Sequence, residues 1–92
     1  MVLFEEYMNH FIEKEIGQNI RVIRENCHFT QNEVAEKLQL LGCDITRSAL
    51  AKIEVGQRHL YPDEIIFLCE VLRCQYSDIL RIQNDRQKYI LD

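Results

Sequence analysis

The sequence predicts an all-α fold, and three observations support this prediction. Apolar residues recur at three- and four-residue spacing along most of the 92-residue chain, as they do in amphipathic helices. No segment shows the apolar-polar alternation of a half-buried strand. With 47% hydrophobic residues, a chain of this length can bury one helical core. We therefore expect one domain of five helices, preceded by an additional N-terminal amphipathic helix.

The first predicted helix covers residues 2–16 and has a wide, aromatic apolar face for a terminal segment. The residues of this face are Leu3, Phe4, Tyr7, Met8, Phe11 and Ile12. We expect Gly17 to interrupt the helix, because glycine is unfavourable inside helices. A surplus of apolar surface is buried either against the domain itself or against a partner subunit. Residues 1–15 are therefore interpreted as an N-terminal helix for packing or dimerisation.

The domain proper is predicted to span residues 16–80. Its first helix, over residues 16–27, has an apolar stripe made of Ile16, Ile20, Ile23 and Cys27. Thr30 is the expected N-cap of the next helix, which begins at Gln31, and Glu33 completes a capping box. The inward-facing residues of this second helix are Val34, Ala35, Leu38 and Leu41, and Gly42 is expected to end it.

The third predicted helix of the domain has two plausible N-caps, Asp44 and Thr46, and ends at Gly56. Its buried side consists of Ala49, Leu50 and Ile53, while its opposite side presents Arg47, Ser48, Ala51 and Lys52. Two short helices around a glycine-containing turn are typical of a helix-turn-helix motif. In such a motif the second helix lies in the DNA major groove, where a few side chains near its start reach base edges.

Two further helices complete the predicted domain. Pro62 favours a helix start, and the apolar positions Ile65, Leu68, Cys69 and Leu72 follow at helical spacing. Ser77 is the expected cap of a short fifth helix that contains Ile79 and Leu80. This helix could continue toward Tyr89 and Ile90. Residues 81–92 are charged, so we interpret them as a fraying C-terminal extension.

The charge distribution permits DNA binding but argues against indiscriminate coating of nucleic acid. The net charge is -4, whereas non-specific binding depends on broad phosphate neutralisation. Residues 1–15 carry -3, residues 61–92 carry -2, and residues 16–60 carry +1. The least acidic part is therefore the part that contains the helix-turn-helix pattern. No apolar run is long enough to span a membrane, and the acidic N-terminus does not resemble a signal peptide. We expect a cytoplasmic protein.

Metal, cofactor and catalytic motifs are not found in the sequence. The four cysteines lack the spacing of zinc ligands, and no phosphate loop or paired carboxylate motif is present. Cys27 and Cys69 lie on apolar helical faces, where free cysteines are usually buried. Cys43 lies in the predicted turn, so we expect it to be the more exposed thiol. We predict no enzyme activity, no cofactor, no metal site and no small-molecule ligand.

Residues 16–80 resemble the phage-repressor and Cro-type helix-turn-helix domain family, whose members share a five-helix, lambda-repressor-like fold. The matching features are Arg24, the start of the second helix at residues 30–35, Ile53-Glu54-x-Gly56, and the proline-led segment from Tyr61 to Leu72 followed by residues 76–80. One departure is a longer connection between the second and third helices. Its extra residues lie at positions 39–44, and extension of the second helix could accommodate them.

The resemblance implies roles for individual residues. The base-reading positions correspond to Arg47, Ser48, Ala51 and Lys52, and the phosphate-contacting positions to Gln31, Gln57 and Arg58. Arg24 and Glu54 occupy positions that form a structural ion pair in similar domains. For the surface residues, an ordinary solvated face or loop is the alternative interpretation.

Two functions are consistent with this sequence. The first is a sequence-specific, double-stranded DNA-binding transcriptional regulator of the repressor type, acting as a homodimer with its third helix in the major groove. The second is a protein-interaction module on the same scaffold, for example an antitoxin or an accessory factor, which the acidic net charge favours.

Overall fold

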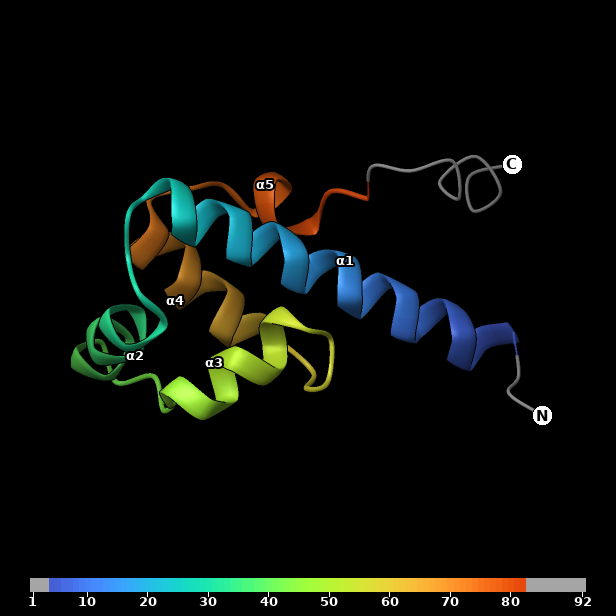
Figure 1. Cartoon of the computed structure of the whole chain (residues 1–92), viewed down its shortest axis with the longest axis horizontal. Coiled ribbons are helices and arrows are strands. Elements are labelled where there is room, and N and C mark those ends of the chain that lie inside the picture. The colour runs from blue at the N-terminus through green and yellow to red at the C-terminus, as the bar shows by residue number, and fades with distance from the viewer. Residues whose placement is uncertain (1–3, 83–92) are drawn as a thin grey trace.

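The computed structural model describes residues 4–82, which contain five α-helices and no β-strand. In chain order the helices are α1 (Phe4–Asn26), α2 (Gln31–Leu40), α3 (Arg47–Glu54), α4 (Pro62–Leu72) and α5 (Tyr76–Leu80). Helices α2 to α5 gather around the C-terminal part of α1, whose N-terminal part extends beyond them (Figure 1). The predicted all-α class is confirmed. The predicted continuation toward Tyr89 and Ile90 lies outside the described residues.

Helix α1 is continuous through Gly17, so the predicted interruption at this residue was wrong. Gly17 is buried where α1 crosses the end of α3. A Cβ atom at this position would collide with the carbonyl oxygen of Ile53 and lie 2.8 Å from that of Glu54. The missing side chain therefore lets the two helices approach closely. This packing offsets the cost of glycine inside a helix, which is about 1 kcal/mol relative to alanine. The predicted boundary between residues 15 and 16 falls within α1.

The core contains at least one fully buried side chain from each helix and one from the α2–α3 turn. These residues are Ile20, Val34, Leu38, Ile45, Leu50, Ile53, Leu68 and Ile79. Burial of an aliphatic side chain of this size contributes roughly 1.5–3 kcal/mol. The core therefore fixes the position of α3 relative to α1, α2 and α4.

The extra residues between α2 and α3 form a connection that is anchored in the core. Helix α2 is not extended to accommodate them. α2 ends at Leu40, and Gly42 adopts a left-handed conformation with φ +87°. Cys43 and Ile45 then place their side chains in the core, with 5% and 0% of their surface exposed. The prediction that Cys43 is exposed was therefore wrong, and burial raises the pKa of its thiol. Two buried anchors give this longer turn a defined path.

Local signals explain the beginnings of α2 and α4. Thr30 and Glu33 form the predicted capping box at the start of α2. Pro62 occupies the first turn of α4, as predicted. The predicted cap of α5 was wrong, because Ser77 lies inside that helix. Gln75 precedes α5, and its backbone N–H donates to the Asp78 carboxylate at 2.9 Å.

Candidate nucleic-acid interface

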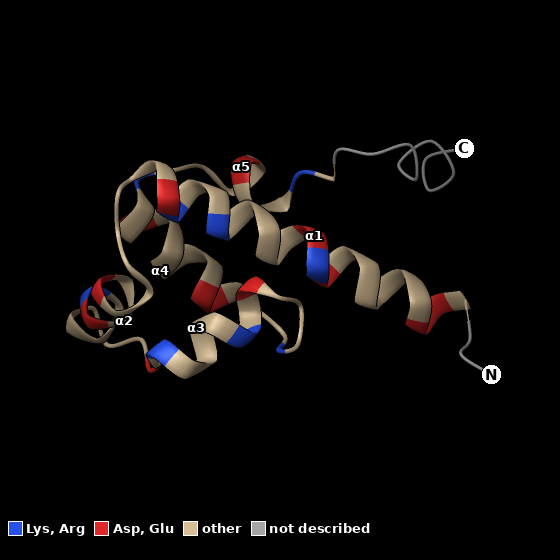
Figure 2. Ribbon diagram, in the orientation of Figure 1, with Lys and Arg blue, Asp and Glu red and all other residues tan. Residues whose placement is uncertain are grey.

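Helix α3 has one buried side and one exposed side. Its first turn is capped by Thr46, whose Oγ1 accepts a hydrogen bond from the Ala49 N–H at 3.1 Å. Of the predicted base-reading residues, Arg47, Ser48 and Lys52 are exposed and Ala51 is half-buried. Figure 2 shows that basic residues lie near both ends of α3. The structure thus places all four predicted residues on the solvent side of one helix.

The two basic side chains of α3 carry charges that no carboxylate in the described part of the chain neutralises directly. Neither Arg47 nor Lys52 takes part in an ion pair there. Both side chains are therefore available to an external anion or to the acceptor atoms of a base edge.

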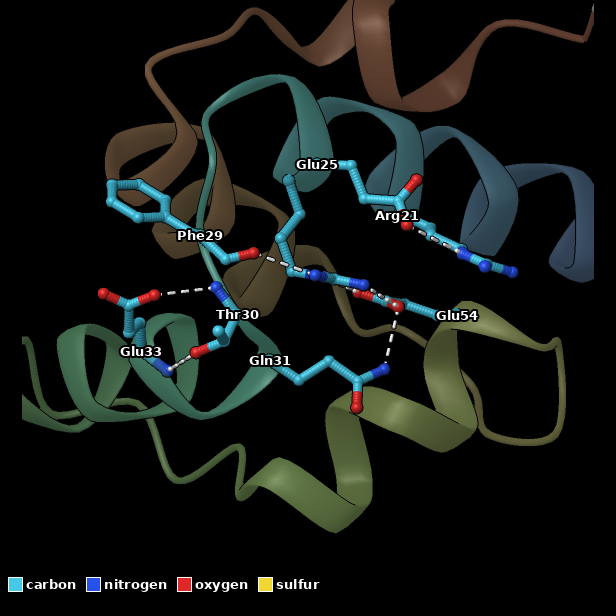
Figure 3. Close-up of polar contacts among 8 residues, drawn as sticks. Arg21, Glu25, Phe29, Thr30, Gln31, Glu33 and Glu54 are labelled. Atoms are coloured by element: carbon cyan, nitrogen blue, oxygen red, sulfur yellow. Dashed lines mark hydrogen bonds and ion pairs between the residues drawn. The ribbon is translucent and has the colours of Figure 1, made fainter.

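Beneath this face, Arg24 and Glu54 form a buried ion pair that joins α1 to the end of α3. Arg24 Nε and Nη2 donate to the two carboxylate oxygens of Glu54 at 2.7 and 3.0 Å. Arg24 Nη1 also donates to the carbonyl oxygen of Phe29 at 2.9 Å (Figure 3). The hydrogen bond to Glu54 raises the pKa of Arg24. All three nitrogens of the buried guanidinium therefore donate at least one hydrogen bond within the domain.

Gln31, at the start of α2, is attached to the same ion pair. Its Nε2 donates to Glu54 Oε1 at 2.9 Å, which links the start of α2 to the end of α3 (Figure 3). The side-chain amide has a second N–H group, so one donor remains for another partner. Gln31 is half-buried at the edge of the α3 face. Sequence reasoning identified Gln31 but not its bond to Glu54.

The loop after α3 holds Arg58 in an ion pair that sequence reasoning missed. Arg58 Nη1 and Nη2 donate to the two carboxylate oxygens of Glu64, both at 2.9 Å, and Nη1 also donates to the His59 carbonyl oxygen. The hydrogen bonds from Arg58 lower the pKa of Glu64. This pairing leaves the Arg58 Nε–H and one Nη2–H for other partners. Gln57 is exposed beside it, and its backbone N–H donates to the Lys52 carbonyl oxygen.

The same loop also contacts α1. His59 Nδ1 lies within ion-pairing distance of a Glu13 carboxylate oxygen, and Gly56 packs against the backbone of Lys14. Gly56 has φ +79°, a conformation that favours glycine over other residues. The loop after α3 is thus held from both sides, by α1 and by α4. No spacing in the sequence pointed to the contact between His59 and Glu13.

Removal of the Thr46 cap should loosen the turn that presents Arg47 and Ser48. We expect Thr46→Ala to lower the free energy of unfolding by about 1 kcal/mol, because the Ala49 N–H loses its acceptor. Thr46→Ser keeps the hydroxyl and is the matched control. Urea denaturation followed by circular dichroism measures both variants. Equal stability of the alanine and serine variants would contradict a capping role.

The fold and the exposed α3 face together define the class of protein: a helix-turn-helix domain that presents its second motif helix to solvent. A family model with the description "Helix-turn-helix" matches residues 20–79. The chain therefore belongs to the phage-repressor and Cro-type helix-turn-helix family and is a DNA-binding regulator. Comparisons with curated proteins and with solved structures gave no match.

Neither a membrane-spanning helix nor a metal-binding cluster is found within residues 4–82. No helix in this range has the length and hydrophobicity needed to cross a bilayer. No group of three or more histidine, cysteine, aspartate or glutamate side chains within the same range is arranged to hold a metal ion.

Proposed function

We propose that the chain is a sequence-specific repressor that binds double-stranded DNA as a homodimer, with α3 of each subunit in the major groove. The observation that carries this proposal is the exposed face of α3, where Arg47 and Lys52 have no ion-pair partner among the described residues. The opposite side of the helix is buried through Leu50 and Ile53. A rigidly seated helix with available cationic side chains can enter a groove without rearrangement of the core.

Direct readout would use the residues of this face according to their chemistry. Arg47 and Lys52 match the paired O6 and N7 acceptors of guanine, and Ser48 can donate or accept. The half-buried Ala51 offers a methyl group that could contact the methyl group of thymine. A well-formed base contact contributes about 1–3 kcal/mol of discrimination against the wrong base.

Backbone contacts would flank the groove on both sides. Gln31 contributes its second amide N–H, and Gln57 and Arg58 contribute donors from the loop after α3. Such contacts fix the register and orientation of the protein on the duplex without reading its sequence.

A dimer explains how so small a module achieves useful affinity. One copy of α3 offers few base contacts, whereas two linked copies bind with a combined affinity far above that of either. Two-fold symmetry would place the half-sites roughly 34 Å apart, about one helical turn of DNA.

Selection from a random duplex library tests the proposal most directly. We expect enrichment of a palindrome whose half-sites are spaced by one helical turn. An enriched site without two-fold symmetry would overturn the homodimer. A pool that stays unenriched at low salt would overturn DNA reading and favour the protein-interaction module.

Loss of the α3 cations should change the salt dependence of DNA binding. We expect Arg47→Ala and Lys52→Ala each to weaken binding by about 1–3 kcal/mol if the side chain reads a base. If it contacts a phosphate instead, the slope of log affinity against log salt should fall by about one. Fluorescence anisotropy across a salt series measures both effects.

The matched control is Arg21→Ala, which removes the same charge from an exposed position on α1. We expect this variant to bind DNA like the parent protein at every salt concentration. An effect of Arg21→Ala as large as that of Arg47→Ala would show that only net charge matters and would refute the α3 interface.

A further inference from the structure

The end of α4 brings two cysteines together. Arg73 adopts a left-handed conformation with φ 53°, and the Cys74 N–H donates to the Cys69 carbonyl oxygen at 3.1 Å. These features define a Schellman motif, in which the side chains at the two ends of the hydrogen-bonded turn come into contact. That contact is usually hydrophobic. Here the two side chains are thiols, and both line the same open groove.

We infer that Cys69 and Cys74 form a dithiol site that a small-molecule disulfide converts into an intramolecular disulfide bond. A disulfide requires Cα atoms about 4.4–6.8 Å apart and side chains that face each other. The backbone hydrogen bond brings the two residues together across a closed turn, and both side chains line one open groove at the end of α4. The turn therefore already has the approximate geometry that the oxidised form needs.

Access to the two thiols is unequal, and this sets the order of the reaction. Both thiols line an open groove together with Tyr76, but Cys74 is half-buried whereas only 8% of Cys69 is exposed. Cys74 is thus the thiol that meets the reagent, and Cys69 is the thiol that resolves the adduct. Cys27 lies near the same corner, but its Sγ donates to the Leu72 carbonyl oxygen.

The reaction consists of two thiol–disulfide exchanges. The Cys74 thiolate attacks one sulfur of the reagent, a new S–S bond forms, and the first reagent thiol leaves with the proton that Cys74 lost. The Cys69 thiolate then attacks the Cys74 Sγ and releases the second reagent thiol, which takes up the proton from Cys69. The protein loses two electrons and two protons, and one reagent disulfide is reduced to two thiols.

Burial predicts that this site reacts slowly at neutral pH and faster in alkaline solution. Burial raises the pKa of Cys74 to about 12, and the pKa of Cys69 is raised by the same cause. The ionisable groups around Cys74 come from several elements. Cys69, Glu70 and Tyr76 line the same groove, Cys27 follows α1, Asp78 lies on α5, and Glu15, Arg73 and Arg81 line the adjoining cleft. Because only the thiolate attacks, the rate should rise about tenfold per pH unit below this pKa.

The chemistry of this site is independent of DNA binding. Figure 1 shows α5 and α3 on opposite sides of α1, so the corner between α4 and α5 lies away from the exposed face of α3. Failure of one proposal would therefore leave the other intact.

Incubation of the full reduced chain with excess oxidised glutathione tests the inference. Intact mass and non-reducing peptide mapping should reveal a bond between Cys69 and Cys74, formed about tenfold faster at pH 9 than at pH 8. In Cys69→Ala, the glutathione adduct on Cys74 should persist because no thiol resolves it. In Cys74→Ala, Cys69 should remain unmodified.

Cys27→Ala is the matched control, because it removes the third thiol of this corner and leaves the pair in place. We expect the same bond at the same rate in this variant. A bond from Cys74 to Cys27, a stable adduct on Cys74 of the unmodified chain, or recovery of both thiols unchanged at pH 9 would each overturn the assignment.

Discussion

Glu54→Ala is expected to lower the free energy of unfolding by about 3–5 kcal/mol. The Glu54 side chain is 2% exposed and that of Arg24 11%, so loss of the carboxylate leaves a guanidinium charge buried without its counter-charge. Gln31 would lose the acceptor of its amide in the same variant. Denaturation by guanidinium chloride, followed by far-UV circular dichroism, measures the change as a shift in the transition midpoint.

The matched control for this variant is Glu25→Ala. Arg21 and Glu25 form an ion pair of the same chemistry at 3.4 Å, but both side chains are about half exposed. Exposed pairs contribute only about 0–1 kcal/mol, because water solvates both charges and salt screens them. If Glu54→Ala were no more destabilising than Glu25→Ala, the pair between Arg24 and Glu54 would not be a structural element of the fold.

The sequence correctly predicted the features that depend on interactions between residues close together in the chain. Thr30 and Glu33 satisfy each other's backbone donors within one turn, so no distant residue is needed to start α2. Pro62 favours the first turn of α4 because of its own fixed φ and its missing N–H. The helical spacing of the apolar residues likewise predicted the all-α class, which the five helices confirm, since periodicity is a property of each segment.

The features that sequence missed depend on contacts between segments far apart in the chain. Gly17 looked like a helix breaker because its propensity is unfavourable, yet its close contact with α3 requires the smallest residue. Cys43 was predicted to be exposed because it lies in a turn, but its side chain is buried in the core. In both cases the tertiary packing outweighs the local preference.

Contacts between separate segments also limited what the sequence could predict about the candidate site. Sequence identified the exposed face of α3 from its polar composition, because the buried side of a helix fixes which residues face outward. It did not reveal that Gln31 is bound to Glu54 or that Arg58 is bound to Glu64, because these pairs are separated by 23 and 6 residues and lie on different elements. Which polar side chains remain available to DNA therefore depends on the fold.

Gly17→Ala provides a test in which local propensity and tertiary packing predict opposite signs. Propensity alone predicts that alanine stabilises α1 by about 1 kcal/mol. The structure predicts a net loss of about 3 kcal/mol, because the added Cβ would strike the carbonyl groups of Ile53 and Glu54. These are backbone atoms, so no change of rotamer relieves the clash, and α1 and α3 must separate. Thermal and urea denaturation measure the sign directly.

The neighbouring exposed residue supplies the control for this variant. Gln18→Ala changes the propensity at the next position of α1 without contact to α3, and we expect a change within about 0.5 kcal/mol. Because Ile53 and Glu54 form the last turn of α3, a displacement at Gly17 also tilts the face that carries Arg47 and Lys52. DNA affinity should therefore fall with stability in Gly17→Ala, even at temperatures where the variant is fully folded. A stabilised Gly17→Ala protein with unchanged DNA affinity would show that α1 does not position α3.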